Sequence, residues 1–377
     1  MIVQSRKVWA AGQFIEAQIE ISDGKINGIY PYETKKADRD YKDKRLVPGF
    51  IDIHTHGAYG FDTNDAHPKG LKNWMKRIPE EGVTGILPTT VTQSEKVLMA
   101  AVSNVADVIK EGYEGAEILG IHFEGPFLNL QYKGAQPPEY IVKGSVEQFK
   151  KYQEAADGYI KLITIAAEED EDFALTHYAS SHGVVVSQGH SGATYEQAVM
   201  AVANGATSMT HVFNGMTPFH HRNPGLVGAA MRLRETYGEF IGDGHHSHFA
   251  SVNNYVTGKG DYAILITDSL CAKHCEGGNF ELGGHPYEVS KDGLARLIGS
   301  DTIAGSTLNM NKGLKNLAED AMIPFGVALN TCTLNPAKCL GIAHRKGKLA
   351  AGYDADMVVL SDDYSVVQTY CRGEEML

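Results

Sequence analysis

The chain alternates short apolar segments with helical stretches, and this alternation limits what it can fold into more than any other feature. The apolar segments are rich in β-branched and aromatic residues, as buried strands are. Residues 94–111 and 194–204 have the apolar spacing of helices. Strands joined by helical crossovers form a parallel sheet, and this pattern predicts an α/β fold, a (β/α)8 TIM-type barrel. The predicted strands are residues 48–57, 82–90, 118–125, 159–166, 183–190, 207–213, 240–244 and 263–268.

Both ends of the chain are predicted to form short strands separated by turns. Neither end is long enough to bury a core by itself. We therefore expect residues 1–47 and 346–377 to form one small β-sandwich domain beside a catalytic barrel of residues 48–345. A hairpin around Gly283 and Gly284 is expected after the eighth barrel strand.

Composition excludes several classes of function. The net charge of −12 argues against nucleic acid and membrane surfaces as partners. No apolar run approaches the roughly 18 residues of a membrane span, and the N-terminus lacks the apolar core of a signal peptide. The five cysteines include no Cys-x-x-Cys pair, which predicts reduced thiols and a cytoplasmic location. An anionic substrate would need a local group of positive charges.

The first predicted barrel strand carries two histidines. Successive strand residues point to opposite faces, so Asp52, His54 and His56 share one face. Two imidazoles at the end of a strand that stops at Gly57 can reach one metal ion. A bare His-x-His is more often an ordinary surface pair, so the metal interpretation depends on the other strands.

Further metal-type ligands follow other predicted strands at their carboxyl ends, where barrel enzymes place their active sites. Taken singly, each has an ordinary explanation as a helix cap, a core histidine or a turn residue. Together, imidazoles and carboxylates favour Zn²⁺ or Fe²⁺ over Mg²⁺ or Ca²⁺, which prefer mostly oxygen. These residues are Glu124 after the third strand, His190 after the fifth, His211 after the sixth and Asp268 after the eighth.

From Leu46 to nearly the C-terminus, the chain resembles the amidohydrolase superfamily. Many members carry a carboxylated lysine at the end of the fourth strand, but residues 165–168 contain no lysine, and Glu124 is present instead. Within the superfamily, this pattern is similar to the enzymes that deacetylate phosphorylated N-acetyl amino sugars. The segments that carry the resemblance are residues 48–57, 122–127, 189–191, 210–216, 242–246, 267–268, 304–306 and 352–356.

The resemblance implies a metal-dependent hydrolase of an N-acetyl amino-sugar 6-phosphate, with one or two divalent ions, Zn²⁺ or Fe²⁺, per subunit. It also implies that Asp268 is the catalytic general base and acid. The implied metal ligands are Glu124, His190 and His211 for one ion and, with Glu124 bridging, His54, His56 and Asp268 for the other.

The resemblance also implies the substrate-binding residues. Gln136 stands where the family often has a histidine that reaches the substrate carbonyl, and an amide N–H can donate the same hydrogen bond. The alternative is that Gln136 is an ordinary loop residue without a role in binding. Arg222 and His246 match phosphate-binding positions, which the backbone N–H groups of Asn214 and Gly215 would supplement. Relatives complete this phosphate site across a subunit interface, which implies a homodimer.

Two alternatives stay open. The first is the galactosamine epimer, the closest rival of the expected glucosamine substrate, because the sequence does not place the surroundings of the sugar 4-hydroxyl. A non-catalytic assembly protein with an amidohydrolase-like barrel is the other alternative. Such proteins typically lose metal ligands, whereas all six candidate ligands are present in this chain.

Overall fold

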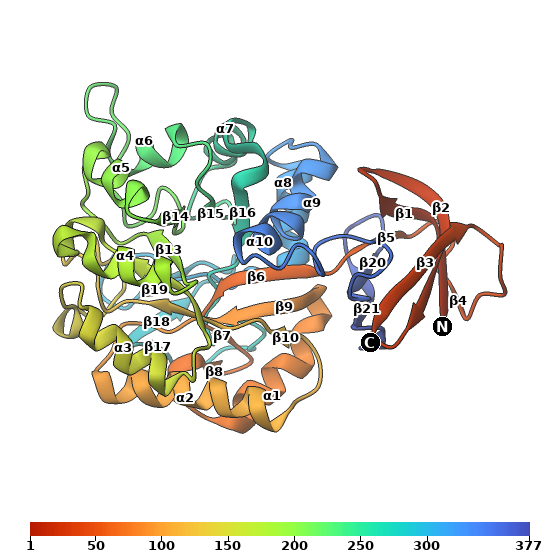
Figure 1. The fold of residues 1–377 in the computed structure, drawn as a ribbon, viewed down its shortest axis with the longest axis horizontal. Helices are drawn as coiled ribbons and strands as arrows, with labels where there is room; N and C mark the ends of the chain where they lie inside the picture. Colours follow the sequence, from red (N-terminus) through yellow and green to blue (C-terminus); the bar gives the residue numbers. More distant parts are fainter.

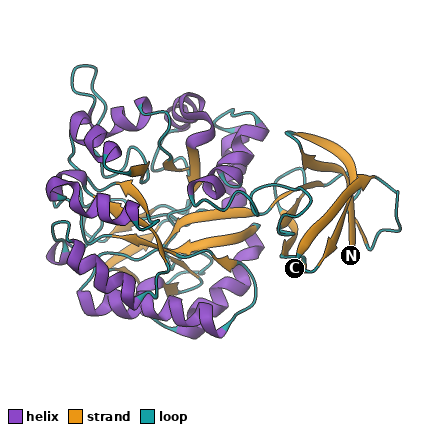
Figure 2. Cartoon of the chain, viewed as in Figure 1, coloured by secondary structure: helices purple, strands orange, loops and turns teal.

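The computed structural model describes all of residues 1–377. A large part built of alternating strands and helices lies beside a smaller sheet that holds both chain termini (Figure 1). Helices surround the strands of the large part, whereas the smaller part consists of strands and loops (Figure 2). None of the helices combines the length and the apolar character that a membrane crossing requires. All five cysteines are unpaired.

Both ends of the chain contribute strands to a single eight-stranded sheet, in the order β22-β21-β20-β5-β1-β2-β3 with β4 paired to β1. The antiparallel pairing of β5 with β20 joins the N-terminal strands to the C-terminal ones. A separate apolar core lies against this sheet. The strands are β1 (Ile2–Ala10), β2 (Gln13–Ser22), β3 (Lys25–Pro31), β4 (Arg39–Asp40), β5 (Arg45–Pro48), β20 (Met357–Leu360), β21 (Val366–Cys371) and β22 (Glu374–Glu375).

The interior strands pair in parallel within three sheets. Short contacts link these sheets: Thr89 bridges to His122, and the N–H of Asp268 donates to the carbonyl of His54 at 2.9 Å. The last of these contacts brings the ends of β16 and β6 together. The strands are β6 (Phe50–Thr55), β9 (Val83–Pro88), β10 (Glu117–Ile118), β11 (Ile121–Glu124), β12 (Ile160–Ile165), β13 (Val185–Gln188), β14 (Ala206–Met209), β15 (Gly238–Ile241) and β16 (Ala263–Ile266).

Several of the helices between these strands begin at a residue whose side chain caps them. Ser94 caps α2 by accepting from the Val97 N–H, and Thr194 forms a capping box with Gln197 at the start of α5. The apolar stripe of α2 packs into the largest core cluster. The helices are α1 (Pro68–Arg77), α2 (Glu95–Glu111), α3 (Val146–Ala155), α4 (Ala174–Ser181), α5 (Tyr195–Ala203), α6 (Gly225–Arg232), α7 (Phe249–Lys259), α8 (Met310–Glu319), α9 (Phe325–Thr331) and α10 (Leu334–Cys339).

Several predicted boundaries differ from the structure. The sixth strand was expected to reach residue 213 but ends at Met209, because His211 and Phe213 adopt positive φ angles of 29° and 83°. The seventh strand runs from Gly238 to Ile241 and ends before residue 244. The predicted hairpin exists as β17 (Phe280–Leu282) and β18 (His285–Val289), and β19 (Ala295–Leu297) extends it to three strands.

Candidate metal centre

Three candidate ligands sit where the chain turns sharply out of a strand. His190, His211 and Asp268 follow β13, β14 and β16 and have φ angles of 47°, 29° and 49°. L-residues rarely adopt this left-handed region, and such conformations concentrate at functional sites. Each turn ends the strand and directs the side chain toward one shared cavity.

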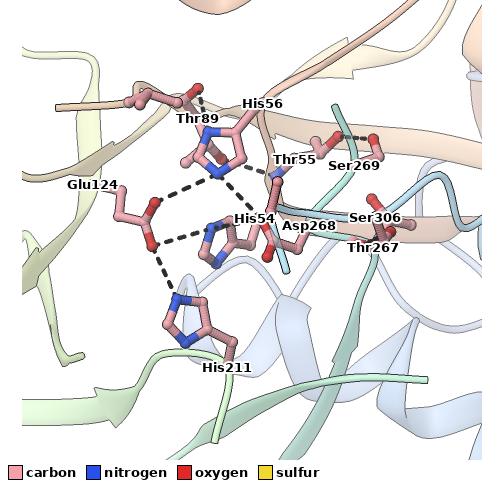
Figure 3. Close-up of polar contacts among 12 residues, drawn as sticks. His54, Thr55, His56, Thr89, Glu124, His211, Thr267, Asp268, Ser269 and Ser306 are labelled. Atoms are coloured by element: carbon pink, nitrogen blue, oxygen red, sulfur yellow. Dashed lines mark hydrogen bonds and ion pairs between the residues drawn. The ribbon is translucent and has the colours of Figure 1, made fainter. Parts of the chain in front are cut away.

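Glu124 lies at the end of β11, and Figure 3 shows its carboxylate facing the rings of His54, His56 and His211. Its Oε1 is 3.2 Å from Nε2 of both His190 and His211. These two imidazole nitrogens are only 3.0 Å from each other. Ring nitrogens that face one another and a carboxylate at this range are arranged as ligands to a common cation.

A second group lies on the other side of the Glu124 carboxylate. Nε2 of His56 is 3.1 Å from Oδ1 of Asp268 and 3.4 Å from Oε2 of Glu124. Nε2 of His54 is 3.5 Å from the same Asp268 oxygen and 3.4 Å from Oε1 of Glu124. The ligand atoms of His54, His56 and Asp268 lie within 4.8 Å of one another, as do those of Glu124, His190 and His211.

The other nitrogen of each histidine ring faces away from the cavity toward a fixed acceptor. Nδ1 of His56, His190 and His211 lies 3.3, 3.0 and 3.1 Å from the backbone carbonyls of Thr89, Tyr132 and Asn214. In contrast, Nδ1 of His54 lies 2.9 Å from the Glu239 carboxylate. An Nδ1–H donated to these acceptors leaves the Nε2 lone pair free for a metal ion.

Asp52 and the hydroxyls around it fix the position of Asp268. The Asp52 carboxylate on β6 accepts from the Thr267 hydroxyl at 2.5 Å, directly before Asp268. On the other side, the hydroxyls of Thr55 and Ser269 are 2.7 Å apart (Figure 3). These buried contacts tie the loop after β16 to β6.

The electrostatics of the group favour a cation. Burial opposes ionisation of Glu124, but His54 and His190 hold the pKa of that carboxyl well below its usual range. Burial likewise raises the pKa of Asp268, yet the adjacent His54 and His56 outweigh this effect and lower it to about 2. Nε2 of His54 is buried without a hydrogen-bond partner. Two ionised carboxylates and a buried ring nitrogen without a hydrogen-bond partner therefore fit a divalent ion.

The cavity at this centre has a volume of about 270 Å³, and no lysine or arginine lines it. Gln136 is buried in its wall, where Nε2 donates to Oε2 of Glu124 at 2.7 Å and Oε1 accepts from the Thr92 N–H at 2.8 Å. Asn214, Gly215 and His246 also line the cavity. The predicted substrate residues other than Arg222 therefore lie together.

Both ring nitrogens of His246 are engaged. Nδ1 lies 2.7 Å from the Asp243 carboxylate, and Nε2 lies 3.0 Å from the carbonyl of Ala304. Burial lowers the pKa of His246, but the hydrogen bond to Asp243 dominates and raises it above its ordinary value. Two acceptors facing the ring favour the protonated form of His246, in which it pairs with the Asp243 carboxylate.

Arg222 is the predicted site residue that the structure leaves outside. It lies on an exposed loop between β14 and α6, where Nη1 is 2.9 Å from Nε2 of His221. It does not line the cavity within this chain.

Sequence reasoning missed other residues of this region. Leu282 and Ile303, from the segment that contains β17 to β19, line the cavity. Glu239 was also missed. Its only sequence signal is a carboxylate inside the otherwise apolar segment of β15.

Comparison with known proteins gives a consistent result. Residues 45–376 match the amidohydrolase family. The N-acetylglucosamine-6-phosphate deacetylase of Bacillus subtilis (strain 168) is 40% identical over 366 residues, covering 94% of this chain and 91% of its own. The N-acetylgalactosamine-6-phosphate deacetylase of Escherichia coli O157:H7 is 32% identical over 363 residues, covering 96% of this chain and 95% of its own.

A solved structure resembles the whole chain. A mutant of N-acetyl-D-glucosamine-6-phosphate deacetylase from Mycobacterium smegmatis, in complex with N-acetyl-D-glucosamine-6-phosphate, superposes with a TM-score of 0.95 at 30% sequence identity. The match covers 100% of this chain and 99% of that one.

Proposed function

The chain belongs to the amidohydrolase family of metal-dependent hydrolases, and from this we propose that it deacetylates N-acetyl-D-glucosamine 6-phosphate. The products are D-glucosamine 6-phosphate and acetate. One observation carries the proposal: five of the six imidazole and carboxylate ligands line a single cavity, and the sixth, His54, lies beside His56 and Asp268, in a chain whose relatives bear this activity.

The proposed architecture is a closed (β/α)8 barrel of residues 48–345 with a small β-sandwich domain of residues 1–47 and 346–377. The hydrogen bond from Asp268 to His54 supports closure, because it links the last barrel strand to the first. The pairing of β5 with β20 supports a terminal domain that needs both chain ends.

The ligand sets support one or two divalent ions, Zn²⁺ or Fe²⁺, per subunit. An ion bound there lowers the pKa of water from about 15.7 toward ~7 and polarises the amide carbonyl. The residues proposed for the first ion are Glu124, His190 and His211, and those for the second, with Glu124 shared, are His54, His56 and Asp268.

Asp268 is the proposed general base and acid. With a pKa of about 2 its carboxylate is ionised at neutral pH and is able to accept a proton from the attacking water. It then returns that proton to the amine nitrogen as the C–N bond breaks and acetate forms. Gln136 is proposed to hold the substrate carbonyl, because its side-chain amide lies 2.7 Å from Glu124 in the same wall.

Recognition of the phosphate is proposed to involve two subunits. The cavity wall has no lysine or arginine, and His246 supplies its positive charge, with the backbone N–H groups of Asn214 and Gly215 as neutral donors. The exposed position of Arg222 fits a residue that enters the cavity of a neighbouring copy in a homodimer. Five unpaired cysteines support a cytoplasmic enzyme.

The galactosamine epimer is the second candidate substrate, because a relative named for it is 32% identical over nearly the whole chain. Assays on the two epimeric 6-phosphates, with metal content measured on the same samples, distinguish the candidates. We expect faster deacetylation of the gluco epimer by protein that contains metal. Absence of turnover on both epimers, in protein with full metal content, would reject the proposed function.

A further inference from the structure

Glu239 is an unusual buried carboxylate. It lies in β15 with no exposed surface. Its Oε2 is 2.9 Å from Nδ1 of His54, whereas its Oε1 has no hydrogen-bond partner. His54 is its only ion-pair partner, and no lysine or arginine reaches it. Burying a carboxylate with so few partners is costly unless a positive charge lies close by.

Glu239 also distinguishes His54 from the other histidines of the centre. His56, His190 and His211 each face a neutral backbone carbonyl through Nδ1. A carboxylate acceptor makes a charge-assisted hydrogen bond, which is about twice as strong as a neutral one. Such a bond fixes the tautomer of the ring and makes its other nitrogen a better metal ligand.

We propose that Glu239 is a positioning residue that acts through His54 to set the affinity of the second metal position. The inference rests on the proposed function, which assigns that position to His54, His56 and Asp268. No hydrogen bond or ion pair links Glu239 to Glu124, His190 or His211. Loss of the carboxylate should therefore weaken one metal position and leave the other unchanged.

The test is a titration of metal-free protein with Zn²⁺ against a competing chelator. We expect the parent to bind two equivalents. Glu239→Ala should weaken the second by roughly 10–100-fold and leave the first unchanged. Glu239→Gln keeps a hydrogen-bond acceptor without the charge, so it should lose less affinity for the second Zn²⁺ equivalent. Tyr255→Phe is the matched control, because the Tyr255 hydroxyl is buried beside Gly238 and has no hydrogen-bond partner.

A double variant separates positioning from a structural role. With His54→Ala already present, Glu239→Ala should have no further effect on Zn²⁺ affinity if it acts through that ring. An additional, additive loss of affinity would contradict the proposal. The thermal midpoint of each metal-free variant shows whether it is folded.

Other results would also overturn the inference. One is a Glu239→Ala protein that binds both Zn²⁺ equivalents with the affinity of the parent. The others are equal weakening of both equivalents in that variant, and a parent protein that binds only one Zn²⁺ equivalent. His54, His122 and Glu239 also form a group whose ligand atoms lie within 4.8 Å of one another. A third equivalent lost in Glu239→Ala, with the second retained, would make Glu239 a ligand itself. Inactive parent protein that binds two ions would reject the proposed function without affecting this inference.

Discussion

The two ends of the proposed substrate site are built differently. At the metal end, two sets of three ligand residues are buried and come from a single chain. At the phosphate end, both N–H groups of His246 already face Asp243 and Ala304, and Arg222 lies outside the cavity. We infer that the bond-breaking chemistry is complete within one subunit, whereas recognition of the anion depends on a second copy.

The largest expected effect tests whether the two ligand sets of the metal end contribute unequally to activity. His190→Ala should abolish activity and remove the ion that His190 holds with Glu124 and His211, because each set offers only three ligands. The paired change of His54 and His56 to alanine should cost less if one ion is sufficient. Metal content per subunit and kcat, measured on the same samples, check this. An inactive His190→Ala protein with full metal content would contradict the ligand assignment.

Asp268→Asn should lower kcat by roughly 10²–10⁴-fold, because it keeps the size of the side chain but removes the proton acceptor. Steady-state kinetics with metal analysis check the effect. Asp301→Asn, an exposed change, is the control. Turnover within a few-fold of the parent, in protein with parental metal content, would remove Asp268 from the proposed proton transfer.

Arg222 tests the phosphate end. Charge-assisted hydrogen bonds contribute about 1.5–3 kcal/mol, so Arg222→Ala should lose roughly 10–100-fold in kcat/KM on the 6-phosphate. The unphosphorylated N-acetyl sugar should be affected little, and equal losses on both substrates would show a structural role. Measurement of kcat/KM for both substrates in one preparation is therefore required.

Subunit mixing sharpens the same comparison. If Arg222 enters the partner's cavity, a heterodimer of Asp268→Asn and Arg222→Ala subunits contains one cavity with an intact Asp268. That cavity receives an arginine only if Arg222 comes from the other subunit, because its own subunit carries Arg222→Ala. Mixed dimers should then recover activity beyond the sum of the two homodimeric variants. Absence of recovery would place Arg222 in its own subunit's cavity.

The sequence predicted the metal end better than the phosphate end, for physical reasons. Parallel strands bring their carboxyl ends to one edge, so Glu124, His190 and Asp268 were expected to meet from spacing alone. The position of Arg222 depends on a loop, and loops follow no such periodicity. Glu239 was missed because a glutamate in a short strand is usually a solvent-facing residue. Only the fold shows that this one faces His54.

The smallest effect concerns the pair formed by Asp243 and His246. Burial opposes both charges, but the hydrogen bond between them lowers the pKa of Asp243 and raises the pKa of His246. The histidine contribution to stability is complete below the unfolded pKa of about 6.5 and is lost as pH rises through the folded pKa. The aspartate contribution is complete above about 3.9 and is lost as pH falls through the folded pKa.

The pair should therefore stabilise the protein most between about pH 4 and 6.5. Asp243→Asn should lower the free energy of unfolding there by about 1.5–3 kcal/mol, since it removes a buried charge-assisted hydrogen bond. The difference from the parent should narrow at both higher and lower pH. This difference in free energy of unfolding is measured by denaturant unfolding of both proteins across pH 3–9. The exposed change Asp301→Asn is the control. A difference that does not vary with pH would show that His246 is not charged at the cavity wall, and the phosphate would then depend on Arg222 alone for its positive charge.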